Sequence, residues 1–410
     1  MIKSQLGALM PSVRFAAAIS VVSAGFFLGL GATAGAQDMK NRAEPVGSAA
    51  TSGNTVTVIA HEKDGRHFVF AGGDGGRLNS FSLSGEGKLL PLETLDLWKG
   101  KGPSRGLVAA VIEGNDYLFL GNKGGNAIEV FRIGGDGGLE RVSVTHDTDS
   151  TFLGSVITLQ VVHFDTGSYL FAGGLEETPG VSSFRISSDG QLHHVQSMKD
   201  TDEMFTDGII GMSTQRVGGA TYVFVDGFHD NGISSFRVTD DGKFTNVSNI
   251  GDDGELFLNG AYPLTSVKLG DETYVVVGHR HHSYYKRKGF IKEENPHYHG
   301  DGVSVFKVDR EGKLVPHMAL RDDDSLRLKG QTRIELMKLD EGRALVAVAS
   351  REEQAIQLCE LGADGVLKPG KIIETGFEIY NGMTSVEIGG TRFLLAGPLK
   401  GKGLYSYAFD

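Results

Sequence analysis

The stretch GVSSFRISSDGQL, residues 180–192, decides the fold. Inward and outward positions alternate along its first half, an Asp-Gly turn follows, and an apolar residue then resumes the pattern. Alternation of this kind has the period of two that belongs to a β-strand, and a short glycine-containing turn joins antiparallel neighbours. The stretch therefore predicts a strand, a tight turn and a second strand.

The same phrase recurs along the chain. Its other copies are RLNSFSLSGEGKL (77–89), AIEVFRIGGDGGL (127–139), GISSFRVTDDGKF (232–244), GVSVFKVDREGKL (302–314) and AIQLCELGADGVL (355–367), and a seventh, partial copy ends the chain as GLYSYAFD. The aligned core positions are Phe81, Phe131, Phe184, Phe236, Phe306, Cys359 and Tyr407, and their spacing is regular except for one long interval of 70 between Phe236 and Phe306. A second recurring strand, such as SYLFAGG, precedes each copy.

A repeat of about 50 residues with about four strands is typical of a propeller blade. Seven copies predict an all-β, seven-bladed β-propeller of four-stranded antiparallel blades over residues 54–410. A helical solenoid is excluded because the apolar period is two and not 3.6. The last repeat stops after its third strand, so we expect the N-terminal segment 37–53 to close the last blade.

Residues 1–36 have the features of a secretory signal peptide. Lys3 and Arg14 precede an apolar run, and small residues at Ala34–Ala36 offer a cleavage site. A retained transmembrane anchor is the alternative, because the run approaches the length that spans a bilayer. Cleavage predicts a periplasmic or secreted chain that begins at Gln37 and has no membrane contact afterwards.

Charge and cysteine content narrow the function classes. The formal net charge of −11 becomes −13 once the two positive charges of residues 1–36 are removed. An acidic chain without a broad basic stripe is not expected to bind nucleic acid. Cys359 is the only cysteine, so no disulfide within the chain stabilises it. We expect a monomer.

The phrases VSSFRISSDGQL and VSVFKVDREGKL, each after a YLFAGG-type strand, resemble the lactonase-type seven-bladed propellers, the family of 6-phosphogluconolactonase and carboxymuconate cyclase. The resemblance covers roughly residues 54–410 and rests on residues that build blades. It implies the fold and a lactonase-like activity. No catalytic motif of that family is matched residue by residue, and similar blades also serve as binding platforms.

The interval of 70 marks an insertion, GHRHHSYYKRKGFIKEENPHYHGDG (278–302), which holds five of the chain's 13 histidines. It connects the second and third strands of blade five, so the insertion at 279–301 lies on the face that also carries the connections between blades. Two His-x-His pairs flank it, and alternate residues of a strand share a face. His279, His281, His297 and His299 are therefore candidate ligands of a divalent metal such as zinc.

Metal-free acid–base chemistry is the second interpretation of this face. Histidine is a competent general base and tyrosine can donate a proton, so the candidate catalytic residues are His229, His281, Tyr284 and His297. His229 corresponds in blade four to His281 in blade five. The third interpretation is a solvated loop that is only rich in histidine.

The loop charge favours an anionic ligand. Residues 279–299 carry five Lys or Arg and two Glu, a local charge of +3 on an acidic chain. The candidate substrate-binding residues are Arg280, Lys286, Arg287, Arg333, Asn259 and Asn381, for a small anionic molecule or an acidic glycan. We expect an exported lactonase-like hydrolase for a small sugar-acid type substrate. The alternatives are a non-catalytic ligand- or protein-binding propeller and an acidic-polysaccharide lyase that uses His and Tyr.

Overall fold

The computed structural model describes residues 44–97, 104–175, 178–280 and 299–409, together with the backbone of 283–285 and 292–294. It contains seven four-stranded antiparallel sheets arranged as the blades of a β-propeller, which confirms the predicted fold class. Among the described residues, one short 3₁₀ helix, Lys123–Gly125, lies in a loop. No helix within the described part of the chain is long and apolar enough to cross a membrane.

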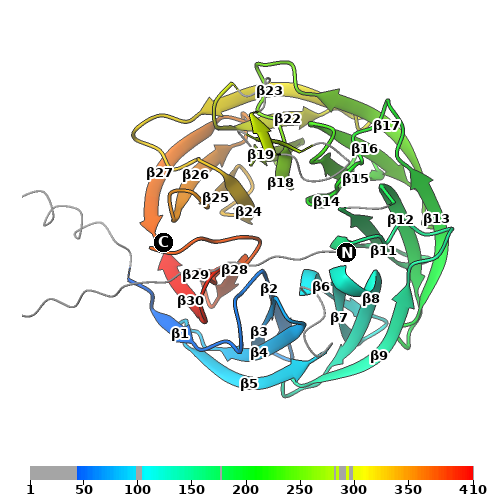
Figure 1. The fold of residues 1–410 in the computed structure, drawn as a ribbon, viewed down its shortest axis with the longest axis vertical. Coiled ribbons are helices and arrows are strands. Elements are labelled where there is room, and N and C mark those ends of the chain that lie inside the picture. The colour runs from blue at the N-terminus through cyan, green and yellow to red at the C-terminus, as the bar shows by residue number, and fades with distance from the viewer. Residues whose placement is uncertain are drawn as a thin grey trace, which may run out of the picture. The chain divides into compact units, whose positions relative to one another are not determined.

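Within each of the first six blades the strands follow the chain from the axis outward, and the seventh does so for its three inner strands (Figure 1). The inner strands are β2 (Thr57–Lys63), β6 (Ser104–Ile112), β10 (Val156–Phe164), β14 (Met212–Val217), β18 (Ala261–Leu269), β24 (Gln331–Lys338) and β28 (Met383–Ile388). The second strands are β3 (Arg66–Gly73), β7 (Asn115–Asn122), β11 (Gly167–Gly174), β15 (Ala220–Gly227), β19 (Glu272–His279), β25 (Arg343–Ser350) and β29 (Thr391–Ala396).

The repeated phrase supplies the two outer strands of the blades. The third strands are β4 (Arg77–Leu83), β8 (Ala127–Ile133), β12 (Gly180–Ile186), β16 (Gly232–Val238), β22 (Gly302–Val308), β26 (Ala355–Gly362) and β30 (Leu404–Phe409). The outermost strands are β5 (Leu89–Asp96), β9 (Leu139–His146), β13 (Leu192–Lys199), β17 (Phe244–Gly251), β23 (Leu314–Arg321) and β27 (Leu367–Glu374). In the blade-five insertion, β20 (Ser283–Tyr285) pairs with β21 (Lys292–Glu294).

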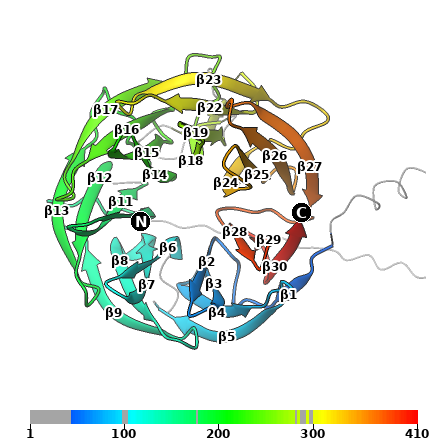
Figure 2. The same cartoon turned by 180° about the vertical axis from the view of Figure 1, so that it is seen from behind.

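The seventh blade takes its outermost strand from the start of the propeller. Strand β1 (Gly47–Ala49) pairs with β30, with Gly47 opposite Ser406. The Ser406 hydroxyl also donates a hydrogen bond to the carbonyl of Gly87 in blade one. The two ends of the described chain are therefore joined in one sheet, and Figure 2 shows the same closed ring from behind.

The turn glycine of the repeated phrase packs against an aromatic ring of the preceding blade. Gly312 has a φ of +82°, and a Cβ there would lie 1.9 Å from the Tyr222 ring. Gly190 has a φ of +81°, and its Cβ would lie 2.8 Å from the ring of Tyr117, whose hydroxyl donates to the Ser188 carbonyl at 2.7 Å. Only glycine satisfies both the backbone conformation and the close approach. The phrase thus builds the blade and also joins it to its neighbour.

The aligned aromatic of the phrase is buried at a bulge. The pairing of the third and fourth strands shifts between Ser183 and Phe184, and again between Ser235 and Phe236. Both phenylalanines are at most 1% exposed and lie in the core between adjacent blades. A bulge bends a strand and increases its twist, so its repetition helps each outer strand follow the curved rim.

Candidate functional site

The start of every inner strand lies on the same face, because successive strands of a blade are antiparallel. Neighbouring inner strands contact one another around the whole ring and enclose an axial cavity of about 200 Å³. The position of a residue within its inner strand therefore determines how far below this face it lies along the propeller axis. We call the face at the strand starts the channel mouth and the cavity below it the axial chamber.

Four side chains from three blades converge at the channel mouth. Arg105 comes from the start of β6, Tyr262 from β18, Arg280 from the residue after β19, and Tyr380 from the segment before β28. The guanidinium carbons of Arg105 and Arg280 lie 4.5 and 4.8 Å from the centre of the Tyr380 ring. Arg280 also lies 5.0 Å from the Tyr262 ring and donates a hydrogen bond of 3.0 Å to the Tyr380 hydroxyl. We call these four residues the mouth cluster.

The two tyrosines of the mouth cluster have opposite acidities. Burial opposes ionisation of Tyr380, but the positive charges of Arg280 and Arg105 outweigh it and lower its pKa to about 7. Burial raises the pKa of Tyr262 well above its ordinary value, and the neighbouring Tyr380 adds to that rise. Their rings meet edge to face at 5.8 Å. The cluster therefore places an ionisable phenol beside one that stays protonated, a division that suits acid–base chemistry.

Arg105 has little charge compensation from the protein. The acid that it approaches is Asp74, at 4.0 Å, and the Asp74 side chain is 51% exposed. The Nε of Arg105 is buried and has no hydrogen-bond partner among the described residues. A guanidinium in this setting is well placed to bind an added anion, since its donors match the oxygens of a carboxylate or phosphate.

An apolar collar adjoins the mouth cluster, and its residues Ile157, Ile210 and Tyr262 also line the chamber. Ile157, Ile210 and Phe228 pack with Tyr262, and Tyr380 contacts the same group. The turn that carries Ile210 is held by Asp226, which accepts hydrogen bonds from the backbone N–H groups of Ile210 and Gly211 at 2.8 and 2.9 Å. Burial raises the pKa of Asp226 well above its ordinary value.

His229 lies beside this collar. Its ring is 5.2 Å from the Phe228 ring, and its Nδ1 is 3.2 Å from an oxygen of Asp207. The backbone N–H of Asp207 in turn donates to the carboxylate of Asp230. Gly208 makes room for the imidazole, because a Cβ there would lie 2.9 Å from its Nδ1. A carboxylate thus orients His229. The Phe228 ring lies between His229 and the mouth cluster, because it contacts the rings of both His229 and Tyr262.

The ends of the blade-five insertion place two more predicted residues. The Nε2 of His279, at the end of β19, is 3.3 Å from Asp301, and the Nδ1 of His299 is 3.8 Å from Asp252. The Nε2 of His299 also bonds the Leu256 carbonyl at 2.8 Å. Within the described ranges no group of three His, Cys, Asp or Glu side chains is arranged to hold a metal ion.

Several predicted residues fall outside the described part of the chain. They are His281, Lys286, Arg287 and His297, and the side chain of Tyr284, whose backbone belongs to β20. The proposed four-histidine metal site and the roles of these residues therefore stay predictions.

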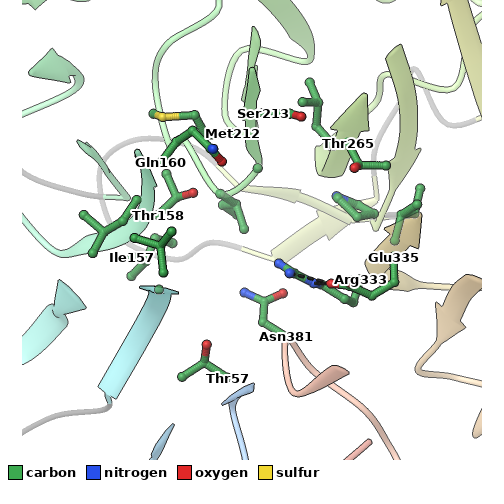
Figure 3. A pocket seen from close by; sticks show the side chains of 18 of the residues that line it. Thr57, Ile157, Thr158, Gln160, Met212, Ser213, Thr265, Arg333, Glu335 and Asn381 are labelled. Carbon is green, nitrogen blue, oxygen red and sulfur yellow. Dashed lines mark hydrogen bonds and ion pairs between the residues drawn. The ribbon is translucent and has the colours of Figure 1, made fainter. Parts of the chain in front are cut away.

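The remaining predicted substrate contacts divide between two places. Arg333 and Asn381 line the axial chamber, and Figure 3 shows both reaching into it. Arg333 donates to one oxygen of Glu335 through Nε at 2.7 Å and Nη2 at 2.6 Å. Asn259 is buried in the loop before β18, and its carbonyl lies 3.3 Å from the Nδ1 of His279.

Sequence reasoning selected Arg280 but passed over Arg105, Tyr262 and Tyr380. A local signal for the tyrosines exists, because each lies within two residues of an Asn-Gly pair at the start of an inner strand, Asn259-Gly260 and Asn381-Gly382. Arg105 carries no such mark, since it follows an unrepeated segment.

Comparison with known proteins supports the fold. No family model and no curated protein matches the chain. A crystal structure of a protein from Lactobacillus plantarum matches with a TM-score of 0.51 and 14% identity, over 81% of this chain and 85% of that one. At this identity the likeness establishes the β-propeller and leaves the lactonase-type family as a prediction.

Proposed function

We propose that the protein is an exported lactonase-like hydrolase that acts on a small anionic substrate of the sugar-acid type at the channel mouth. The observation that carries the proposal is the convergence of Arg105 and Arg280 on the phenol of Tyr380. The lactonase-type resemblance of the blades favours the hydrolase class, and the N-terminal stretch favours export.

Each group has a defined task in this reaction. The guanidiniums bind the anionic group of the substrate and stabilise negative charge that develops on the lactone carbonyl oxygen. The Tyr380 phenolate accepts a proton from water, whose oxygen bonds to the carbonyl carbon. The ring C–O bond then breaks, and the leaving alkoxide takes a proton from the Tyr262 phenol. Transfer of the proton gained by Tyr380 to its neighbour Tyr262 restores both groups. Addition of water thus yields one hydroxy acid.

His229 is a second proton carrier in this proposal. Its position beside Asp207 resembles the common arrangement in which a carboxylate orients an imidazole. His281, Tyr284 and His297 are kept as proposed contributors from the insertion, because they follow or precede strands that end at the same face. A bound divalent metal at the histidine pairs is kept on the same basis.

The test is turnover by the mature chain, residues 37–410, on a panel of sugar-acid lactones. We expect Tyr380→Phe and Arg280→Met to lower kcat/KM by about 100-fold or more, the usual contribution of a positioned base or charge. A matched control is Arg132→Met on β8, away from the axis. It also removes an arginine beside a tyrosine, because the Arg132 guanidinium carbon lies 6.0 Å from the centre of the Tyr117 ring. Equal activity in Arg280→Met and Arg132→Met would exclude the mouth cluster as the active site.

Elimination is the second candidate reaction. A phenolate between guanidiniums can also remove the proton next to a carboxylate, which the arginines would neutralise. An acidic glycan incubated with the protein would then give an unsaturated product that absorbs in the ultraviolet. Saturable binding of sugar acids without any product would instead select the non-catalytic binding propeller.

A further inference from the structure

The axial chamber below the collar has its own chemistry. Its wall is formed by the inner strands, and Figure 3 shows polar side chains on several blades facing the same space. These polar lining residues are Thr57, Thr158, Gln160, Ser213, Thr265, Thr332, Arg333, Glu335 and Asn381. The chamber is thus more than an extension of the cationic mouth cluster.

Four of these lining side chains make no hydrogen bond to another described residue: Thr57, Thr158, Thr265 and Asn381. Their neighbours Thr332 and Ser213 do, to the Ile379 carbonyl and to Ser266. Three hydroxyls and an amide therefore keep their donors and acceptors for whatever fills the chamber.

The Arg333–Glu335 pair adds a planar donor and acceptor on one wall. Both bonds between them go to the same carboxylate oxygen, so Nη1 of Arg333 and the second oxygen of Glu335 remain available. The Arg333 side chain is 37% exposed, which shows that solvent reaches it. A pair of neighbouring hydroxyls fits this arrangement, because one can donate to the carboxylate while the other accepts from the guanidinium.

Size and charge define the ligand class. The volume of about 200 Å³ is far above the roughly 15 Å³ that a single water requires. The charges of Arg333 and Glu335 cancel, so the chamber attracts an anionic ligand less strongly than the mouth cluster does. Leu159, Met212 and Leu264 provide apolar wall for the C–H faces of a ring.

We propose that the axial chamber is a binding site for a neutral polyhydroxylated molecule of monosaccharide size, held by Arg333, Glu335, Asn381 and the unpartnered threonine hydroxyls. This site adjoins the mouth cluster, which shares Tyr262 with the chamber lining, but it does not depend on the hydrolase proposed there. It gives the protein a second ligand on the same axis.

The test is calorimetric titration of the mature chain with D-glucose, D-galactose and myo-inositol. We expect saturable binding of at least one of them. The variants Thr158→Val and Thr265→Val keep the side-chain shape and should each weaken that binding by about five- to tenfold. Glu335→Gln should weaken it by at least tenfold, since it removes a charged acceptor.

Thr214→Val is the matched control. Thr214 lies on the same strand as Ser213 but outside the chamber lining, and its hydroxyl donates to the Tyr222 carbonyl at 2.9 Å. We expect a lower melting temperature with unchanged affinity, whereas Thr158→Val should leave the melting temperature of the free protein nearly unchanged.

Two results would overturn the proposal. One is the lack of saturable binding of all three probes. The other is binding that survives Glu335→Gln and Thr265→Val but is lost in Arg280→Met, which would place the ligand at the mouth. If the mature chain binds a polyol but hydrolyses no lactone, only the proposed hydrolase is contradicted.

Discussion

The two ends of the inner strands treat positive charge in opposite ways. At the channel mouth, Arg105 and Arg280 approach the phenol of Tyr380, and the acid near Arg105 is a half-exposed Asp74 at 4.0 Å. At the far end, His61 and Lys63 of β2 both bind the buried carboxylate of Asp116 on β7, with His61 at 2.6 Å. The far end uses its cations to join blades one and two, whereas the mouth leaves them for a ligand.

The pKa values of Asp116 at the far end and Tyr380 at the mouth show the same difference between the two ends. Burial alone would raise the pKa of Asp116, but Lys63 and His61 outweigh it and hold that pKa below its usual range. Tyr380 is the corresponding anion at the mouth, and a phenol with a pKa of about 7 can exchange a proton with a substrate near neutral pH. The cations around Asp116 are matched by a buried carboxylate and stabilise the fold. At the mouth, Arg105 approaches the half-exposed carboxylate of Asp74 instead, which favours a role in binding a ligand.

The largest effect on stability is expected at the far end. Asp116→Ala leaves His61 and Lys63 partly buried without their carboxylate and should lower the free energy of unfolding by about 3 kcal/mol. Urea denaturation of the two proteins measures the difference. A change below about 1 kcal/mol would show that this end is no more structural than the mouth.

The next effect separates binding from stability at the mouth. Arg105→Met should weaken binding of a sugar-acid anion by about tenfold or more, because it removes one of two charged donors. At pH 6, where Tyr380 is protonated, it should change the free energy of unfolding by less than about 1 kcal/mol, since its partner Asp74 is half-exposed and lies 4.0 Å away. Titration with the anion and its neutral alcohol analogue checks both halves, and equal losses for the two ligands would argue against charge recognition.

Tyr380→Phe gives an effect on stability with a defined pH dependence. The folded-state pKa of about 7 is below the ordinary value of 10, so folding favours the phenolate. That stabilisation is complete above pH 10 and is lost as the pH falls through about 7. Wild type should therefore gain stability over Tyr380→Phe between pH 7 and pH 10, and its tyrosinate ultraviolet absorbance should show a step near pH 7 that the variant lacks.

The smallest effect is expected for Lys400→Met. Glu378, close before Tyr380 in the chain, accepts hydrogen bonds from Lys400 at 2.9 Å and from Arg351 at 3.0 Å. Lys400 is 75% exposed, so its loss should cost less than about 0.5 kcal/mol and leave the Tyr380 titration in place. A displaced titration would show that the rim, as well as Arg105 and Arg280, sets the charge at the mouth.

The architecture was predictable because its determinants are local. Alternation, the turn glycines and the aligned aromatics all occur within each short phrase, and the structure gives each a direct task, as with Phe184 in the core and Gly190 against Tyr117. The repeat then extends one blade to seven. A short segment is enough to infer the strands and turns, and the number of copies along the chain gives the number of blades.

The mouth cluster was not predictable in the same way. Arg105, Arg280 and Tyr380 come from three widely separated parts of the chain, and only the closed ring brings them to one axis. The density of histidine singles out the insertion, which contributes Arg280, whereas Arg105, Tyr262 and Tyr380 lie at or just before the starts of ordinary inner strands. The acidity of Tyr380 depends on two distant guanidiniums, so no inspection of its own neighbours along the chain reveals it.

Closure of the ring by β1 has a consequence for how the chain folds. Ala49 pairs with Leu404, near the opposite end of the chain, so the seventh sheet is complete only when both ends of the propeller are present. The entropy of closing so long a loop grows slowly, by about 0.6 kcal/mol per doubling of length, so the equilibrium cost is modest. The kinetic burden is larger, because contacts this distant in sequence form slowly. Until they form, or if a protease removes Gly47–Ala49, β30 presents an open strand edge on which a second chain can pair.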